Sequence, residues 1–122
     1  MLKHLIRSAL VAFRVIPSPR FTLRTVERHP APNEISADEL VLVKSGGQEK
    51  WACFICPCGC GNRMQLSLNP KVRPNWRVLS DWLNRPTIHP SIRQLNACWG
   101  HYWIRSGEVD WCADTGRESH SE

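Results

Sequence analysis

Three cysteines fall within one short segment near the middle of the chain, Cys56-Pro-Cys58-Gly-Cys60-Gly61. Thiolates are soft donors that suit zinc, and the proline and glycines between them let backbone amides turn toward the sulfurs. A second closely spaced pair, Cys98-x-x-His101, follows later in the sequence. Two separated half-sites allow one structural zinc ion to tie distant segments together and to stabilise a small fold.

The chain offers more metal donors than one tetrahedral site can use. Cys53 lies at a strand-like alternation and Cys112 ends a predicted hairpin, so both are expected to pack in the interior. The remaining candidates are Cys56, Cys58, Cys60, Cys98 and His101. That set is one larger than a closed tetrahedral site holds, and His101, Cys53 and Cys112 stay open as alternative ligands.

Disulfide pairing is the competing explanation for six cysteines in a chain of this length. Cysteines at i and i+2 cannot easily bridge each other, and no secretory signal is evident. Thiolates around zinc persist under reducing conditions, so we expect a cytoplasmic protein. The longest apolar run is also too short for a transmembrane helix, which needs about 20 residues.

The chain has 122 residues, which predicts one zinc-binding domain spanning 1–122. Apolar residues at helical spacing predict an amphipathic helix over about 1–15, followed by a core over about 20–114 and a frayed tail at 115–122. The net charge is +5, with the basic excess concentrated before the cysteines. Acidic residues are interspersed from Glu27 onward, so no continuous basic stripe exists and nucleic acid is not the expected partner.

The alternation of apolar and polar residues predicts strands over 21–28 and 63–68. An apolar run predicts a strand over 40–43, and the turn signal Ser45-Gly46-Gly47 leads into another over 50–55. A hairpin is expected where 101–104 and 109–112 flank Ser106-Gly107. The segment 76–83 fits either a strand or a short helix, and the prolines keep 86–90 extended. The expected fold class is therefore a small, mostly β, α+β domain: a zinc-stabilised antiparallel sheet with an N-terminal helix.

Several of these motifs together resemble a family of small bacterial zinc proteins encoded beside genes for ubiquitin-like conjugation, the Bub operons. The resemblance covers roughly 50–112 and rests on the cysteine run, Thr87-Ile-His-Pro-Ser91 and Cys98-x-x-His101-Tyr-Trp103, with Gly107 and Trp111. It implies a peptidase that processes or removes a ubiquitin-like protein, in a system of antiphage defence. The implied partners are the ubiquitin-like protein or its conjugate, with the conjugation enzymes of the same operon as further candidates.

The resemblance implies that Ser91 is the nucleophile of a serine hydrolase. A serine needs a base to take its proton, and His101 is the preferred candidate. This choice leaves Cys56, Cys58, Cys60 and Cys98 as a four-sulfur zinc site. His89 is the second choice, because it lies two residues from Ser91 and on the same face of an extended segment; His101 could then return to the metal. No acidic orienting residue is identified: Asp110 and Asp114 are merely near in sequence.

Two other function classes remain open. A non-catalytic zinc module could bind a protein or nucleic acid through its basic N-terminus and its tryptophans, with Trp76, Trp82, Trp99 and Trp103 as candidates. Hydrolysis by the zinc itself is disfavoured, because thiolate-rich sites are mostly closed and the sequence has no His-Glu-x-x-His motif. The serine peptidase is the favoured interpretation.

Overall fold

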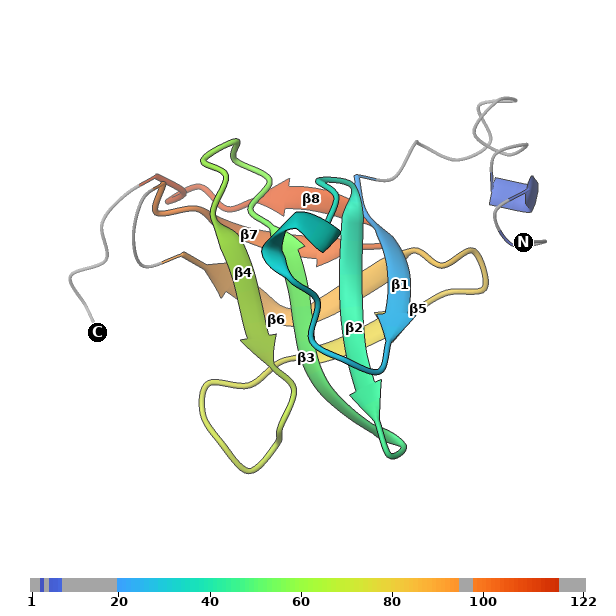
Figure 1. Ribbon diagram of the computed structural model, residues 1–122. Helices are drawn as coiled ribbons and strands as arrows, with labels where there is room; N and C mark the ends of the chain where they lie inside the picture. The colour runs from blue at the N-terminus through green and yellow to red at the C-terminus, as the bar shows by residue number, and fades with distance from the viewer. Residues whose placement is uncertain (1–2, 4, 8–19, 95–97, 117–122) are drawn as a thin grey trace.

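The structure is a computed structural model that describes residues 3, 5–7, 20–94 and 98–116 (Figure 1). The residues described near the N-terminus are helical, and the Arg7 guanidinium donates a hydrogen bond of 3.1 Å to the Leu83 carbonyl. The rest of the helix expected over 1–15, with most of its apolar face, lies outside the described residues, as does the tail after Gly116. No helix within the described ranges is long and apolar enough to cross a membrane.

Two four-stranded sheets make up the described part of the chain. The first has the order β1-β2-β3-β4, with bounds Thr22–Val26, Glu39–Ser45, Gln48–Ile55 and Arg63–Ser67. The second has the order β5-β6-β7-β8, with bounds Arg77–Ser80, Pro86–Arg93, His101–Arg105 and Glu108–Trp111. The prediction of a mostly β fold is confirmed, and the ambiguous segment 76–83 contains the strand β5.

The pairing is antiparallel except between β1 and β2, which run parallel. A parallel pair needs a crossover connection. The segment between β1 and β2 supplies it and contains a short 3₁₀ helix, Pro32–Glu34. Alternation along single strands carries no information about strand direction. The parallel pair and the division into two sheets were therefore not predictable from it.

The main hydrophobic core lies between the two sheets. Inward-facing residues of both sheets share one cluster, which includes Leu42, Phe54 and Leu66 from the first sheet and Ile88 and Tyr102 from the second. A smaller cluster on the outer face of the first sheet contains Val41, Val43, Cys53 and Ile35. Because the period of a strand is two residues, these alternating positions fix which backbone segments lie near one another.

The β7–β8 hairpin has the two-residue turn that the sequence predicts. Ser106 and Gly107 adopt φ values of 49° and 80°, the paired positive values of a type I′ turn. The turn sets the register: Arg105 pairs with Glu108 and Trp103 with Asp110. His101 at the start of β7 therefore lies opposite the residue that follows β8, and the backbone N–H of Cys112 donates to the His101 carbonyl at 2.9 Å.

Candidate active site and metal centre

A bulge in β6 sets the position of Ser91. Ile88 pairs with Ile104 and Ile92 pairs with Tyr102 on β7, so the three residues 89–91 lie opposite the single residue Trp103. Extra residues of this kind bend a strand and redirect its side chains, and they are frequent beside active sites. Ser91 is partly buried, and its carbonyl accepts a hydrogen bond of 3.2 Å from the indole N–H of Trp76.

Ser91 and His101 are hydrogen-bonded across the two strands. Arg93 and His101 are register partners in β6 and β7, and Ser91 lies two residues before Arg93. Side chains two residues apart share a face of a strand. The Ser91 hydroxyl oxygen accordingly lies 3.1 Å from Nε2 of His101.

Asp114 contacts the opposite nitrogen of the same imidazole. Its Oδ1 lies 2.6 Å from Nδ1 of His101. The segment that carries it is fastened to the His101 backbone: the Cys112 N–H donates to the His101 carbonyl, and the His101 N–H donates to the Thr115 hydroxyl at 2.8 Å. Two bonds to one residue thus aim the intervening carboxylate at the ring.

Arg93 completes this group from the neighbouring strand. Its guanidinium forms an ion pair with Asp114, and its Nη2 lies 2.9 Å from Nδ1 of His101. Hydrogen bonds from His101 and then Arg93 lower the pKa of Asp114 to about 2. The Asp114 carboxylate can accept only from a ring nitrogen that carries a hydrogen, so its position favours the tautomer of His101 with the hydrogen on Nδ1. Nε2 is then the acceptor that faces the Ser91 hydroxyl.

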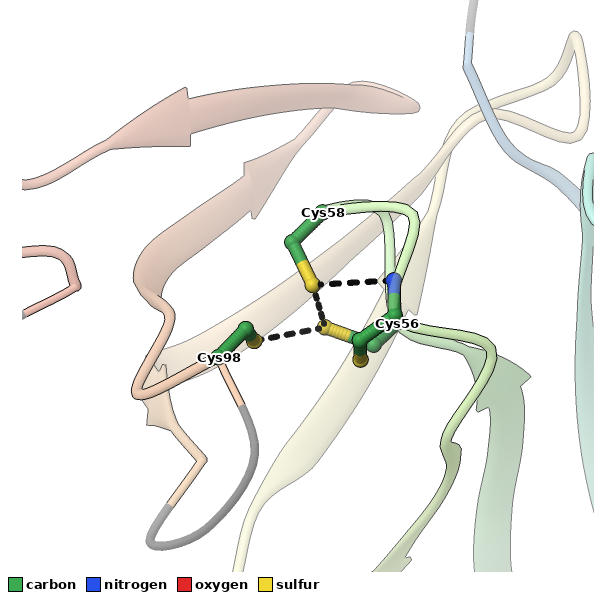
Figure 2. Close-up of side chains that lie close together, drawn as sticks. Cys56, Cys58 and Cys98 are labelled. Carbon is green, nitrogen blue, oxygen red and sulfur yellow. Dashed lines mark hydrogen bonds between the residues drawn. The ribbon is translucent and has the colours of Figure 1, made fainter.

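The four cysteines Cys56, Cys58, Cys60 and Cys98 converge at one end of the sandwich, and their sulfurs all lie within 4.8 Å of one another. The first three come from the end of β3 and the β3–β4 turn, and Cys98 comes from the segment before β7, as Figure 2 shows for three of the four. The sulfur of Cys56 lies 3.4 Å from that of Cys58 and 3.6 Å from that of Cys98. Sulfurs tetrahedrally arranged about zinc are separated by about 3.8 Å, so this cluster could hold such an ion.

The surroundings of the cysteine cluster supply hydrogen bonds to sulfur. Burial raises the pKa of the Cys56 thiol, while the buried Tyr102 hydroxyl donates to its sulfur at 3.8 Å. Burial also raises the pKa of Tyr102, so this phenol keeps its proton. For Cys60, burial acts upward on the pKa, but the Asn62 N–H and the neighbouring thiols outweigh it and lower the value to about 7. Gln94, itself buried, accepts from the Cys98 thiol at 2.8 Å.

The other candidates from the sequence lie elsewhere. His89 is exposed and packs against the ring of Trp103, with the ring centroids 5.6 Å apart. Cys53 is fully buried in the smaller hydrophobic cluster. His101 is grouped with Cys112 and Asp114, apart from the four cysteines.

Sequence reasoning did not single out Asp114 or Arg93. The predicted hairpin could have identified Asp114 as a neighbour of His101. A two-residue turn at Ser106-Gly107 pairs 103 with 110, which places the residues after 111 beside His101. Asp110, the other aspartate near His101 in the sequence, instead forms an ion pair of 2.8 Å with Arg105. No comparable signal identified Arg93, because its register depends on the β6 bulge.

A partly buried hydroxyl, an imidazole and a carboxylate in one hydrogen-bonded chain are the arrangement of serine hydrolases. A comparison with known protein families matches residues 26–112 to BubE, the bacterial ubiquitination-like system serine protease. The match covers more than half of the chain, and the protein belongs to this family. The resemblance noted in the sequence is thereby confirmed. The matched region includes the four clustered cysteines, Ser91 and His101, and it ends before Asp114. No curated protein and no solved structure matches the chain.

Proposed function

We propose that this protein is a serine peptidase in which Ser91 is the nucleophile, His101 its base and Asp114 the residue that orients the base. The observation that carries the proposal is the continuous chain of contacts, 3.1 Å from Ser91 to His101 and 2.6 Å from His101 to Asp114. A non-catalytic binding module would have no need of this chain. The three side chains come from three separate segments, which makes their convergence specific.

In the proposed reaction, Nε2 of His101 takes the hydroxyl proton as Ser91 Oγ attacks the scissile carbonyl. The tetrahedral intermediate collapses to an acyl-enzyme, and the imidazolium returns the proton to the leaving amine. A water molecule, deprotonated by the same nitrogen, then releases the acid and regenerates Ser91. The carboxylate of Asp114 stabilises the positive charge that His101 carries between these steps, and Arg93 holds that carboxylate in place.

We further propose that the cysteine cluster binds one structural zinc ion through Cys56, Cys58, Cys60 and Cys98. Four thiolates satisfy a closed tetrahedral site, and the donor set matches the metal's preference. Bound zinc would crosslink the β3–β4 turn to the segment before β7, the strand that carries His101. The ion would hold His101 at its distance from Ser91 and would take no part in the chemical steps.

The proposed substrate is a bacterial ubiquitin-like protein or its conjugate, cleaved after the C-terminal residue of the ubiquitin-like part. The family's place in a ubiquitination-like system supports this choice. The conjugation enzymes of that system are further candidate partners, and the proposed setting is the cytoplasm, where zinc thiolates persist. A role in antiphage defence also belongs to the proposal. Phage challenge of cells that carry either the unaltered protein or its Ser91→Ala variant would test it.

A fluorophosphonate probe tests the nucleophile without any knowledge of the substrate, because it reacts with activated serines. We expect one adduct per chain, located by peptide mapping at Ser91, and none in the Ser91→Ala variant. The exposed Ser80 provides a matched control, and Ser80→Ala should label like the unaltered protein. Labelling that survives Ser91→Ala would refute the assignment.

A further inference from the structure

The strand β4 has a free edge, because it lies at the end of its sheet and, among the residues that the structure describes, pairs only with β3. Two hydrogen bonds fix which residues point toward β3: Leu68 N–H to the Lys50 carbonyl at 3.0 Å, and Cys56 N–H to the Asn62 carbonyl at 2.8 Å. Since the backbone alternates with a period of two, the N–H and C=O groups of residues 63, 65 and 67 point outward.

One of these outward groups is already in use. The Ser67 carbonyl accepts a hydrogen bond of 2.9 Å from the Trp76 N–H. Gln65, at the centre of the strand, is exposed, and by the same alternation its backbone N–H points away from β3. A sheet edge of this kind is a template for another extended chain.

The segment that carries Ser91 is contacted by residues beyond both ends of β4. At one end, the Trp76 indole contacts the Ser91 carbonyl at 3.2 Å; at the other, the Cys60 thiol contacts the Gln94 side chain at 3.7 Å. Cys60 precedes β4, and the Trp76 N–H is bonded to the Ser67 carbonyl at its other end. Trp76 therefore links the β4 edge directly to Ser91.

A groove of about 990 Å³ continues from the same place. Its lining includes Gln65 and Ser67 of β4, Trp76 and the loop that follows β4. Its charged residues are Lys50, Lys71 and Arg73 against the single carboxylate of Glu49. The groove therefore carries an excess of positive charge, which is complementary to an acidic segment.

We propose that the substrate's extended C-terminal tail adds to β4 as an additional strand, paired through the backbone of Gln65, and that the groove binds acidic side chains of the same substrate. This inference rests on the proposed function and adds how the ubiquitin-like substrate is bound. Pairing through the main chain does not require side chains on the tail, so a small-residue tail can be held beside Ser91. The acidic contacts add recognition of the partner.

The sharpest test replaces Gln65 by proline and, as the matched control, by alanine. Proline removes the outward N–H and leaves the bonds from β4 to β3 intact, whereas alanine removes only the side chain. Each variant is combined with Ser91→Ala and titrated with a purified ubiquitin-like protein of such a system. Gln65→Pro should weaken binding by at least about tenfold, and Gln65→Ala by less than about threefold. Equal affinities for the two variants would overturn the proposal.

Hydrogen exchange provides a second measurement that does not depend on the folding of the proline variant. In the Ser91→Ala protein, the Gln65 amide should exchange quickly when free and slowly when the ubiquitin-like protein is bound. The Leu66 amide, which faces β3, serves as the internal control and should be protected in both states. A Gln65 amide that stays fast at saturation would overturn the proposal.

Charge reversal tests the groove separately. Lys71→Glu combined with Arg73→Glu should weaken binding and flatten its dependence on salt, since both residues are exposed and act through screened charge. Unchanged affinity would overturn this part. Binding is measured on the Ser91→Ala protein and probe labelling on the unaltered protein, so the docking proposal and the peptidase proposal can fail separately. If the Gln65 amide is protected but Ser91 is not labelled, docking is supported and the peptidase is refuted. If Ser91 is labelled but the Gln65 amide stays unprotected, the peptidase is supported and docking at β4 is refuted.

Discussion

Asp114 and His101 are joined twice, once through their side chains and once through the backbone that surrounds them. The carboxylate lies 2.6 Å from Nδ1 of the imidazole, while the His101 N–H and C=O bind Thr115 and Cys112 on either side of the aspartate. The orientation of the ring is therefore built into the end of the β7–β8 hairpin.

The first prediction concerns this pair. Asp114→Asn should lower kcat by about 10⁴-fold, because the amide favours the wrong tautomer of His101. Asp110 is a matched control, because Asp110 and Asp114 each lie two residues from Cys112 in the sequence. The exposed Asp110 is paired with Arg105, so Asp110→Asn should leave kcat within about twofold. Steady-state cleavage of a ubiquitin-like substrate measures both. If the Asp114→Asn protein has the kcat of the unaltered protein, the assignment of Asp114 as the orienting residue is wrong.

The second prediction concerns the ionisation of Asp114. Hydrogen bonds from His101 and Arg93 lower its pKa to about 2, below the ordinary value for aspartate of about 3.9. A carboxylate with a lowered folded pKa adds stability that is complete above the unfolded pKa and is lost as the pH falls toward the folded pKa. The carboxyl carbon shift of Asp114 in a ¹³C NMR titration should stay constant from pH 7 down to about pH 4. A midpoint at or above the ordinary aspartate value of about 3.9 would contradict the geometry.

The third prediction addresses Arg93 as a positioning residue. Arg93→Met removes the second of the two hydrogen bonds to Asp114, so the pKa of Asp114 should rise toward its ordinary value. The rate should fall by about tenfold with little change in KM, since the residue acts through Asp114. Arg93→Lys should recover part of the rate because it restores a positive charge. A purely structural role would instead lower the melting temperature and leave the Asp114 pKa unchanged.

The fourth prediction concerns the metal. Purified protein should contain one zinc per chain, and Cys98→Ser should lose both the metal and the folded state. The reason is one of magnitude: structural zinc contributes about 10 kcal/mol or more, and a small domain has only about 5–15 kcal/mol of stability.

Cys112→Ser is the control for the metal, because Cys112 lies outside the four-cysteine cluster. It should retain zinc and its melting temperature. Elemental analysis with thermal melts in the presence of a strong chelator measures both variants. A protein without zinc, or one whose melting ignores the chelator, would contradict the assignment.

Local features of the fold could be predicted from the sequence because they depend on local chemistry. The Ser106-Gly107 turn, the alternating strands and the cysteine half-sites each leave a pattern in a short window. The parallel pairing of β1 with β2 and the β6 bulge leave none, because they depend on packing between distant segments.

The same distinction applies to the candidate site. Ser91 and His101 belong to short motifs, and the family resemblance carried by those motifs made Ser91 a candidate nucleophile and His101 its candidate base. Asp114 depends on the hairpin register and Arg93 on the bulge, and neither is recognisable as a single residue in the sequence. The free edge of β4 likewise becomes visible only when the sheet order is known.

The central claim is that Ser91 is the nucleophile, and cleavage by the Ser91→Ala protein tests it most directly. The substrate is a ubiquitin-like protein extended at its C-terminus, and the readout is release of the extension by mass spectrometry, with zinc content and melting temperature recorded beside it. Removal of one hydroxyl oxygen should leave zinc and melting nearly unchanged and lower the rate by about 10⁶-fold. Cleavage by Ser91→Ala at the rate of the unaltered protein would contradict the account.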